Sequence, residues 1–199
     1  LVPKSWSWYF QTSLYSKQPT VYYGLMYLAK NAKKEVKIHT PYIICNDYMY
    51  NELKNIKVPT TIMTNSAENN GNIFGAVDYL NHKKDIINTG VTIKEYEGGI
   101  SYHGKSMTID DDIAIVGSFN MDMRSAYIDT ELMLVINSKD INKQLKASME
   151  EYEKKAATVK NETEYSHIPE GMKMKELSDK KKNIKAWFGW AMNGLRFLF

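Results

Sequence analysis

Helical and extended spacings of apolar residues alternate along the first half of the chain. In residues 17–34 the apolar positions recur every three or four residues, which predicts a helix. A run rich in β-branched residues at 35–44, interrupted at Pro41, predicts a strand. The same patterns then predict a short helix ending at residue 54 and capped by Asn46 or Asp47, a strand at 60–64, a helix at 73–88 and a strand at 91–96.

This alternation of helices and strands indicates right-handed βαβ units, and therefore an α/β fold whose sheet is mixed but mainly parallel. The acidic turn at 110–112 should fold its flanking strands into a hairpin, which adds antiparallel character. A final strand is predicted at 130–137 and an amphipathic helix at 140–160. The helix residues expected to face the interior are Ile141, Leu145, Met149 and Tyr152.

Composition changes after residue 160 and divides the chain into three parts. Residues 1–160 are expected to form one domain, and the polar residues 161–178 a linker or an extended wrap. Residues 179–199 combine a basic entry with an aromatic-rich helix. Such a helix is typical of a membrane interface, but the same aromatic stripe would also pack on the domain or on a missing half.

Bulk composition excludes several classes of protein. The net charge of +3 suits a phosphate-bearing substrate, whereas a dedicated nucleic-acid binder would show a clustered basic stripe, which the predicted core lacks. Cys45 is the only cysteine, so no internal disulfide forms, and we expect it to be buried. No apolar run reaches the length of a membrane span, so we expect this piece of chain to be soluble.

Four polar residues gather at the predicted hairpin. Alternation places His103 and Lys105 on one face of the first strand, and Ser118 and Asn120 on one face of the second. This set provides a nucleophile or base, a fixed cation, a hydroxyl and an amide. It suits an anionic phosphodiester better than an acyl group or a metal, and it occurs once in the chain.

Two carboxylates accompany this set. Glu131 begins an apolar strand, where an unpaired charge would be costly, so it either faces the site or lies exposed at the sheet rim; we favour the site. Asp110 lies at the hairpin turn. At about 3.4 Å per strand residue it is too far from His103 to touch it, so we expect it to cap the turn or bind backbone.

The spacing H-x-K-x4-D followed by G-S-x-N resembles the HKD motif of the phospholipase D superfamily. Residues 116–125 together with Thr130-Glu131 resemble most closely its bacterial cardiolipin synthase branch, and the runs at 40–43 and 64–66 add to the likeness. The similarity covers approximately residues 19–138. It implies one HKD half with the phospholipase D-like α/β/α sandwich fold.

The resemblance also implies roles for the polar residues. His103 would be the nucleophile or its partner acid, and Lys105 and Asn120 would stabilise the phosphoryl oxygens. Ser118 would support the same oxygens or hold Glu131, which in related proteins orients the histidine.

Asp122 and Arg124 match a further run of the cardiolipin synthase branch, and a structural role is favoured for both. Arg124 would pair with Asp122 or contact a substrate phosphate. We expect no cofactor and no metal. The four histidines of the chain are too far apart in the sequence to show the close spacing of zinc ligands. They are His39, His82, His103 and His167.

Together these features predict the C-terminal half of a cardiolipin synthase-type phosphatidyltransferase, in a chain that begins without methionine. One motif supplies half a site, so the expected partner is the N-terminal HKD half or a second copy, with a phosphatidylglycerol-like substrate. The whole protein would be membrane-associated, with peripheral membrane contact by this half. Two alternatives stay open: a metal-independent endonuclease acting as a homodimer, and a non-catalytic lipid-binding or scaffold half.

Overall fold

The computed structural model describes residues 18–191 and 196, and an eight-stranded sheet forms its centre. The strand order is β10-β9-β4-β3-β1-β5-β6-β8, with β2 and β7 paired in a separate two-stranded sheet. The strands are β1 (Val36–His39), β2 (Ile43–Ile44), β3 (Thr60–Asn65), β4 (Thr92–Tyr96), β5 (Ser106–Ile109), β6 (Ile113–Gly117), β7 (Met121–Asp122), β8 (Met133–Asn137), β9 (Ala156–Val159) and β10 (Tyr165–His167).

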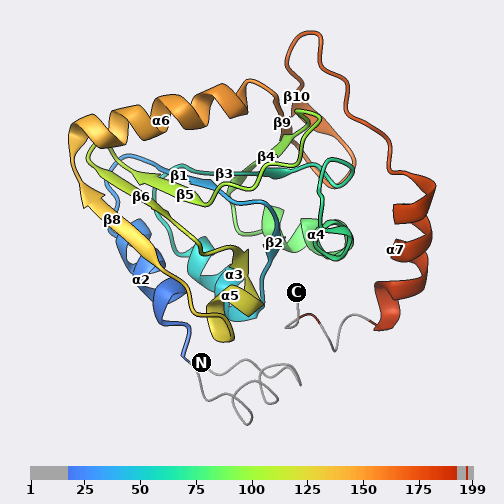
Figure 1. The fold of residues 1–199 in the computed structure, drawn as a ribbon, viewed down its shortest axis with the longest axis horizontal. Coiled ribbons are helices and arrows are strands. Elements are labelled where there is room, and N and C mark those ends of the chain that lie inside the picture. Colours follow the sequence, from blue (N-terminus) through green and yellow to red (C-terminus); the bar gives the residue numbers. More distant parts are fainter. Residues whose placement is uncertain (1–17, 192–195, 197–199) are drawn as a thin grey trace.

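Helices cover both faces of this sheet. Figure 1 shows α6 along one face and α2, α3 and α5 along the other, which gives the expected α/β/α sandwich. The helices are α2 (Thr20–Lys30), α3 (Asp47–Lys54), α4 (Ile73–Ile87), α5 (Met123–Tyr127), α6 (Lys139–Glu153) and α7 (Asp179–Ala191).

The sheet is mixed, as expected, but its mainly parallel character is not found. Within this eight-stranded sheet only β1, β3 and β4 pair in parallel. On one side β5, β6 and β8 continue the sheet antiparallel, and on the other side β9 and β10 do the same. The alternation of helix and strand that indicated parallel pairing ends at Tyr96. Beyond it, β5–β6 and β9–β10 are antiparallel hairpins joined by short connections, and the pairs β1–β5, β6–β8 and β4–β9 are antiparallel as well.

Local signals place most elements of the first half within a few residues. Asn46 caps α3, because its side chain accepts a hydrogen bond from the Met49 N–H at 3.0 Å. The amphipathic helix predicted at 140–160, however, ends at Glu153. The chain then forms β9 against β4, and β10 within the stretch predicted as a linker. The proposed division into three parts stays a prediction.

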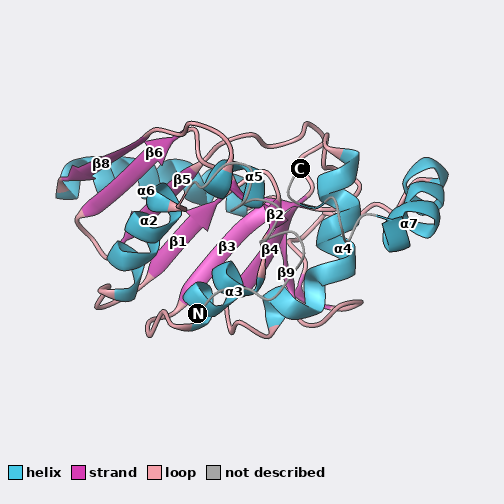
Figure 2. Cartoon of the chain, turned by 90° about the horizontal axis from the view of Figure 1, so that it is seen from below, coloured by secondary structure: helices cyan, strands magenta, loops and turns pink. Residues whose placement is uncertain are grey.

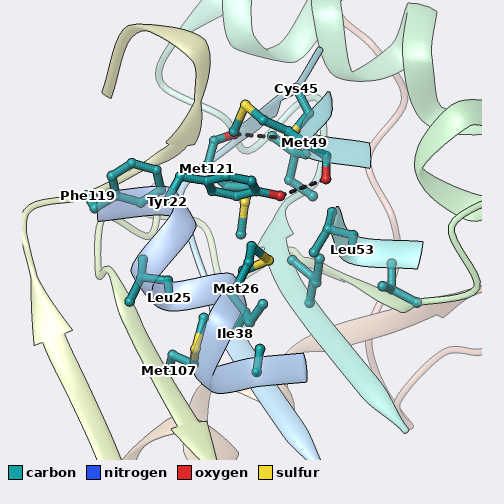
Figure 3. Packing of buried hydrophobic residues seen from close by; sticks show 14 of the residues in the cluster. Tyr22, Leu25, Met26, Ile38, Cys45, Met49, Leu53, Met107, Phe119 and Met121 are labelled. Atoms are coloured by element: carbon teal, nitrogen blue, oxygen red, sulfur yellow. Dashed lines mark hydrogen bonds between the residues drawn. The ribbon is translucent and has the colours of Figure 1, made fainter. Parts of the chain in front are cut away.

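The hydrophobic core lies between the sheet and the helices α2, α3 and α5, and Figure 3 shows part of it. The Tyr22 hydroxyl is buried there and donates a hydrogen bond to the Met49 carbonyl at 2.7 Å. Cys45 is fully buried, as predicted, and its thiol lies 3.7 Å from the Met121 carbonyl oxygen. Residues labelled in the figure that also belong to this core are Leu25, Met26, Ile38, Leu53, Met107 and Phe119.

The face under α6 is different, and it corrects the prediction for that helix. Met149 is buried as expected, but Ile141 and Tyr152 are 41% and 42% exposed. Asn142 and Glu153 are buried instead. The helix therefore meets the sheet mainly through polar side chains.

Charged residues on the sheet surface explain why polar residues of α6 face it. Glu153 accepts a hydrogen bond from Lys94 at 2.7 Å and lies 3.2 Å from the His39 ring, with Lys37 at 3.8 Å. Burial alone would raise the pKa of Glu153, but hydrogen bonds from His39 and Lys94 lower it to about 2. An ionised carboxylate thus holds the end of α6 to the sheet.

Helix α7 stands at the outer side of the molecule, next to α4 (Figures 1 and 2). Its Lys181 ammonium donates hydrogen bonds to three backbone carbonyls, those of Ala67, Glu68 and Asn70, at 2.8, 2.5 and 3.0 Å. Over the part of the chain that is described, every helix is too short or too polar to cross a membrane. The aromatic side chains from Trp187 onwards lie outside the described residues, so their packing or membrane role stays a prediction.

Candidate active site

The motif residues meet at one end of the β5–β6 hairpin, in loops rather than in strands. His103 and Lys105 precede β5, which begins at Ser106, and Ser118 and Asn120 follow β6, which ends at Gly117. The prediction of shared strand faces is therefore wrong in detail. The antiparallel pairing still brings the two loops together, because the start of β5 lies beside the end of β6.

Two glycines permit this arrangement. A Cβ on Gly117 would lie 2.1 Å from the Leu132 carbonyl oxygen, and a Cβ on Gly104 would lie 2.2 Å from the Tyr102 hydroxyl. Both distances are too short for any side chain. Gly117 lets β6 end close to the segment that carries Glu131, and Gly104 leaves room for the Tyr102 ring beneath the His103 loop.

His103 and Lys105 form a close pair. The Lys105 ammonium lies 3.0 Å from Nδ1 of His103 and donates a hydrogen bond to the His103 carbonyl at 2.9 Å. Partial burial, and then the charge of Lys105, lower the pKa of His103. The pKa of Lys105 is also lowered by burial, although Glu131 and Asp122 act in the opposite direction. Both effects on His103 favour the neutral imidazole, the form in which it can attack an electrophile.

Glu131 is held by two serine hydroxyls. Ser118 donates to one carboxylate oxygen, and Ser125 donates to the other at 2.7 Å. Ser125 in turn accepts hydrogen bonds from the backbone and side-chain amides of Asn120, both at 3.3 Å. Ser118 thus holds Glu131, one of the two roles expected for it.

The predicted contact between Glu131 and His103 is not found. Within the described part of the chain no hydrogen bond joins them, and the side-chain donors to the two carboxylate oxygens are Ser118 and Ser125. The sequence offered one signal for Ser125, which lies inside the run that resembles the cardiolipin synthase branch, but its bridging role was missed. The side-chain oxygen of Asn120 is buried without a hydrogen-bond partner.

The accompanying charged residues have structural contacts. Asp122 is buried and caps α5 by accepting a hydrogen bond from the Ser125 N–H, and burial raises its pKa to about 6. Arg124 pairs with Asp129, with 3.1 Å between Nε and a carboxylate oxygen, and not with Asp122.

Asp110 lies at the far end of the hairpin from His103, as its position in the sequence predicted. Its backbone has φ 53°, in the left-handed region. Its carboxylate accepts hydrogen bonds from the N–H groups of Lys33, Lys34 and Glu35 at 2.9, 2.7 and 3.2 Å. It ties the hairpin turn to the loop between α2 and β1.

A cavity of about 400 Å³ opens beside His103. Apart from the imidazole, its walls carry amide and hydroxyl groups together with backbone. The lining residues are Pro41, Tyr42, Asn70, Gly71, Asn72, Ser101 and His103.

Comparison with protein families gives a match over residues 25–152 to the family described as cardiolipin synthase, PLD-like domain. The chain belongs to this family. Cardiolipin synthase 1 of Staphylococcus epidermidis (strain ATCC 12228) is 31% identical over 157 residues, which cover 77% of this chain and 31% of the relative. A cardiolipin synthase of Staphylococcus aureus (strain N315) is 32% identical over 127 residues, or 62% of this chain and 25% of the relative. The chain thus spans about a quarter to a third of the length of these cardiolipin synthases.

Solved structures show the same fold. The phosphatidylserine synthase of Haemophilus influenzae Rd KW20 superposes with a TM-score of 0.62 at 17% identity, over 88% of this chain and 44% of that one. Nuc, a phospholipase D family member from Salmonella typhimurium, gives 0.56 at 15% identity, over 69% and 89%. The resemblance of this PLD-like domain to the phospholipase D superfamily and its cardiolipin synthase branch is thereby confirmed.

Proposed function

We propose that this domain is one half, the C-terminal one, of a cardiolipin synthase-type phosphatidyltransferase, and that His103 is its nucleophile. The observation that carries the proposal is the His103 imidazole 3.0 Å from the Lys105 ammonium, at the edge of a cavity. A cation that close favours binding of a phosphate while leaving the imidazole unprotonated. The serine-held Glu131 and the Asn120 amide lie on the adjacent loop.

The chemistry follows from this geometry. A ring nitrogen of His103 attacks the phosphorus of a phosphatidyl donor, and the bond from phosphorus to the headgroup oxygen breaks. The leaving alkoxide takes a proton from an acid, and phosphatidyl-His103 remains. An acceptor alcohol then gives its proton to the same group and attacks the phosphorus, which releases His103. Lys105 and Asn120 stabilise the negative charge that grows on the phosphoryl oxygens.

The acid comes from a second HKD half, and the molecular surface next to the site suits such a partner. Strand β8 is an edge of the sheet, and its unpaired backbone can accept another chain. A groove of about 480 Å³ runs between α2 and β8, with Glu131 in its wall. The exposed apolar residues that line it are Leu132, which is 77% exposed, Tyr27 and Val135. Leu134 and Tyr23 are exposed elsewhere on β8 and α2. Exposed apolar patches of this kind are typical of interaction surfaces.

The substrate in this proposal is a phospholipid with a hydroxylated headgroup such as phosphatidylglycerol. The amide and hydroxyl walls of the cavity beside His103 match such a headgroup. The phosphate charge is met by Lys105, whereas the acyl chains would remain in the membrane, which this domain touches peripherally.

Covalent trapping in the full-length protein tests the proposal. With phosphatidylglycerol radiolabelled at phosphorus, wild-type protein should retain the label in an acid-labile, alkali-stable bond to histidine. His103→Ala should form neither this adduct nor cardiolipin. His82→Ala is the matched control, because His82-Lys83-Lys84 in α4 is a second H-x-K sequence without the rest of the motif. Cardiolipin formation by His103→Ala at the wild-type rate would refute the assignment. Metal-independent cleavage of plasmid DNA, with no lipid turnover, would favour the endonuclease instead.

A further inference from the structure

The His103 loop has no strand partner of its own. Residues 97–105 run between β4 and β5 without joining the sheet. Backbone N–H and C=O groups that are removed from water need hydrogen-bond partners, so something other than a strand must satisfy this segment. The residue directly before His103 is Tyr102, and its partner is a side chain.

That side chain belongs to Asn65, the last residue of β3, which is 1% exposed. Its amide oxygen accepts a hydrogen bond from the Tyr102 N–H at 2.8 Å, and its amide nitrogen donates one to the Tyr102 carbonyl at 2.9 Å. The same amide also donates to the Pro41 carbonyl at 2.8 Å and accepts from Asn69 at 3.1 Å. All four hydrogen-bonding positions of the amide are thus occupied.

This pair of bonds to one residue imitates the pairing of two strands. An amide group has the same donor and acceptor as a peptide bond, so Asn65 serves as a one-residue strand for Tyr102. The adjoining loop adds weaker support, because Asn69 donates to the Ile100 carbonyl at 3.2 Å and the Gly71 N–H donates to the Ser101 hydroxyl at 3.1 Å.

The Tyr102 ring is fixed independently of its backbone. It packs edge-on against Tyr152, with ring centroids 4.8 Å apart, and against His39 and Tyr96 at 5.6 and 6.0 Å. These ring contacts fix the side chain, whereas the Asn65 amide binds both backbone groups of Tyr102, the residue that leads into His103.

We propose that Asn65 is a positioning residue for the transfer reaction, which holds the main chain so that the His103 imidazole lies in line with the scissile phosphate bond. The inference rests on the proposed function, because it takes His103 as the nucleophile. Reaction rates are sensitive to such placement, and a displacement of about 1 Å can cost about 100-fold.

Kinetics of the full-length protein test this role. Asn65→Ala should lower kcat by about 100-fold while KM changes by less than about threefold, since substrate binding depends on other groups. The matched control is Asn142→Ala. Asn142 is an equally buried asparagine whose amide donates to the Ile113 carbonyl at 2.7 Å, at the end of the hairpin far from His103. Asn142→Ala also removes a buried side-chain hydrogen bond, so it controls for lost stability, and it should keep kcat within about threefold of wild type.

Asn65→Asp gives a second readout that a purely structural role would not produce. An ionised aspartate has no donor for the Tyr102 and Pro41 carbonyls, whereas a protonated one recovers a donor. The kcat of this variant, corrected for the folded fraction, should therefore rise as pH falls, relative to wild type.

The outcomes separate the two proposals. Equal kcat losses in folded Asn65→Ala and Asn142→Ala overturn the positioning role, as does an unchanged kcat in Asn65→Ala while His103→Ala is inactive. If Asn65→Ala does not fold, Asn65→Asp decides, and a pH dependence identical to wild type overturns the role. Full activity of His103→Ala instead removes the proposed function itself.

Discussion

Replacing Asp110, the aspartate of the HKD motif, should destabilise the fold and leave the chemistry at His103 intact. The carboxylate accepts hydrogen bonds from the N–H groups of Lys33, Lys34 and Glu35, and its own backbone is left-handed. Alanine removes all three acceptor contacts and also disfavours the left-handed backbone. Asparagine keeps one oxygen and tolerates that backbone.

Magnitudes follow from these contacts. Hydrogen bonds to a charged group contribute about 1.5–3 kcal/mol each when buried, and those of Asp110 are partly exposed, so about 1 kcal/mol each applies. A left-handed alanine adds about 1 kcal/mol. After allowance for solvent reaching the freed N–H groups, Asp110→Ala should lose about 3 kcal/mol of unfolding free energy and Asp110→Asn about 1 kcal/mol.

Urea unfolding followed by circular dichroism measures both variants in this chain. Burial acts to raise the pKa of Asp110, but hydrogen bonds from the Lys33, Lys34 and Glu35 N–H groups lower it below 3.8. The stabilisation is therefore present above pH 3.8 and is lost as pH falls through the lowered pKa, so the gap between wild type and Asp110→Ala should narrow in acid. A gap below about 0.5 kcal/mol at pH 7, or asparagine costing more than alanine, would refute the reasoning.

Three further predictions concern Lys105, Gly104 and Glu153. Lys105→Met removes a charge that lowers the pKa of His103, so that pKa should rise in an NMR titration of the ring C2 proton, and an unchanged pKa would contradict the pairing. Gly104→Ala should cost about 1–3 kcal/mol by urea unfolding, because its Cβ meets the Tyr102 hydroxyl, and adding Tyr102→Phe should recover part of the loss. Glu153→Gln should lower the unfolding free energy by about 2–3 kcal/mol above pH 5, with the difference shrinking as pH falls from 4.5 towards 2; a constant difference would count against an ionised Glu153.

Local signals explain which elements of the fold were predictable. Helix α3 and its Asn46 cap, and the strands up to Tyr96, depend on neighbouring residues, and their sequence patterns located them. Strand β9 was missed because its pairing partner, β4, lies far back in the chain. The inward face of α6 was misjudged for the same reason, since the charged sheet surface that selects Glu153 is formed by distant strands.

In the candidate site, too, some features could be predicted from local sequence, whereas others depend on contacts between separate loops. The spacing of His103, Lys105, Ser118 and Asn120 is a sequence feature, and the hairpin brings these residues together as expected. Hydroxyl bridging by Ser125 depends on how the loops after β6 and before β8 fold over each other. No periodicity in the sequence reports such a contact.

The strand order also affects how the chain folds while it is being synthesised. When β4 leaves the ribosome, β1 and β4 are the outer strands of a three-stranded parallel sheet, and both outer edges still lack their neighbours. The partner of β1 is β5 and that of β4 is β9, which are made later. Until β9 is complete, a nascent chain presents open backbone to its neighbours on the polysome. Chains that stall or are cut before residue 156 should therefore aggregate rather than fold as a shortened domain.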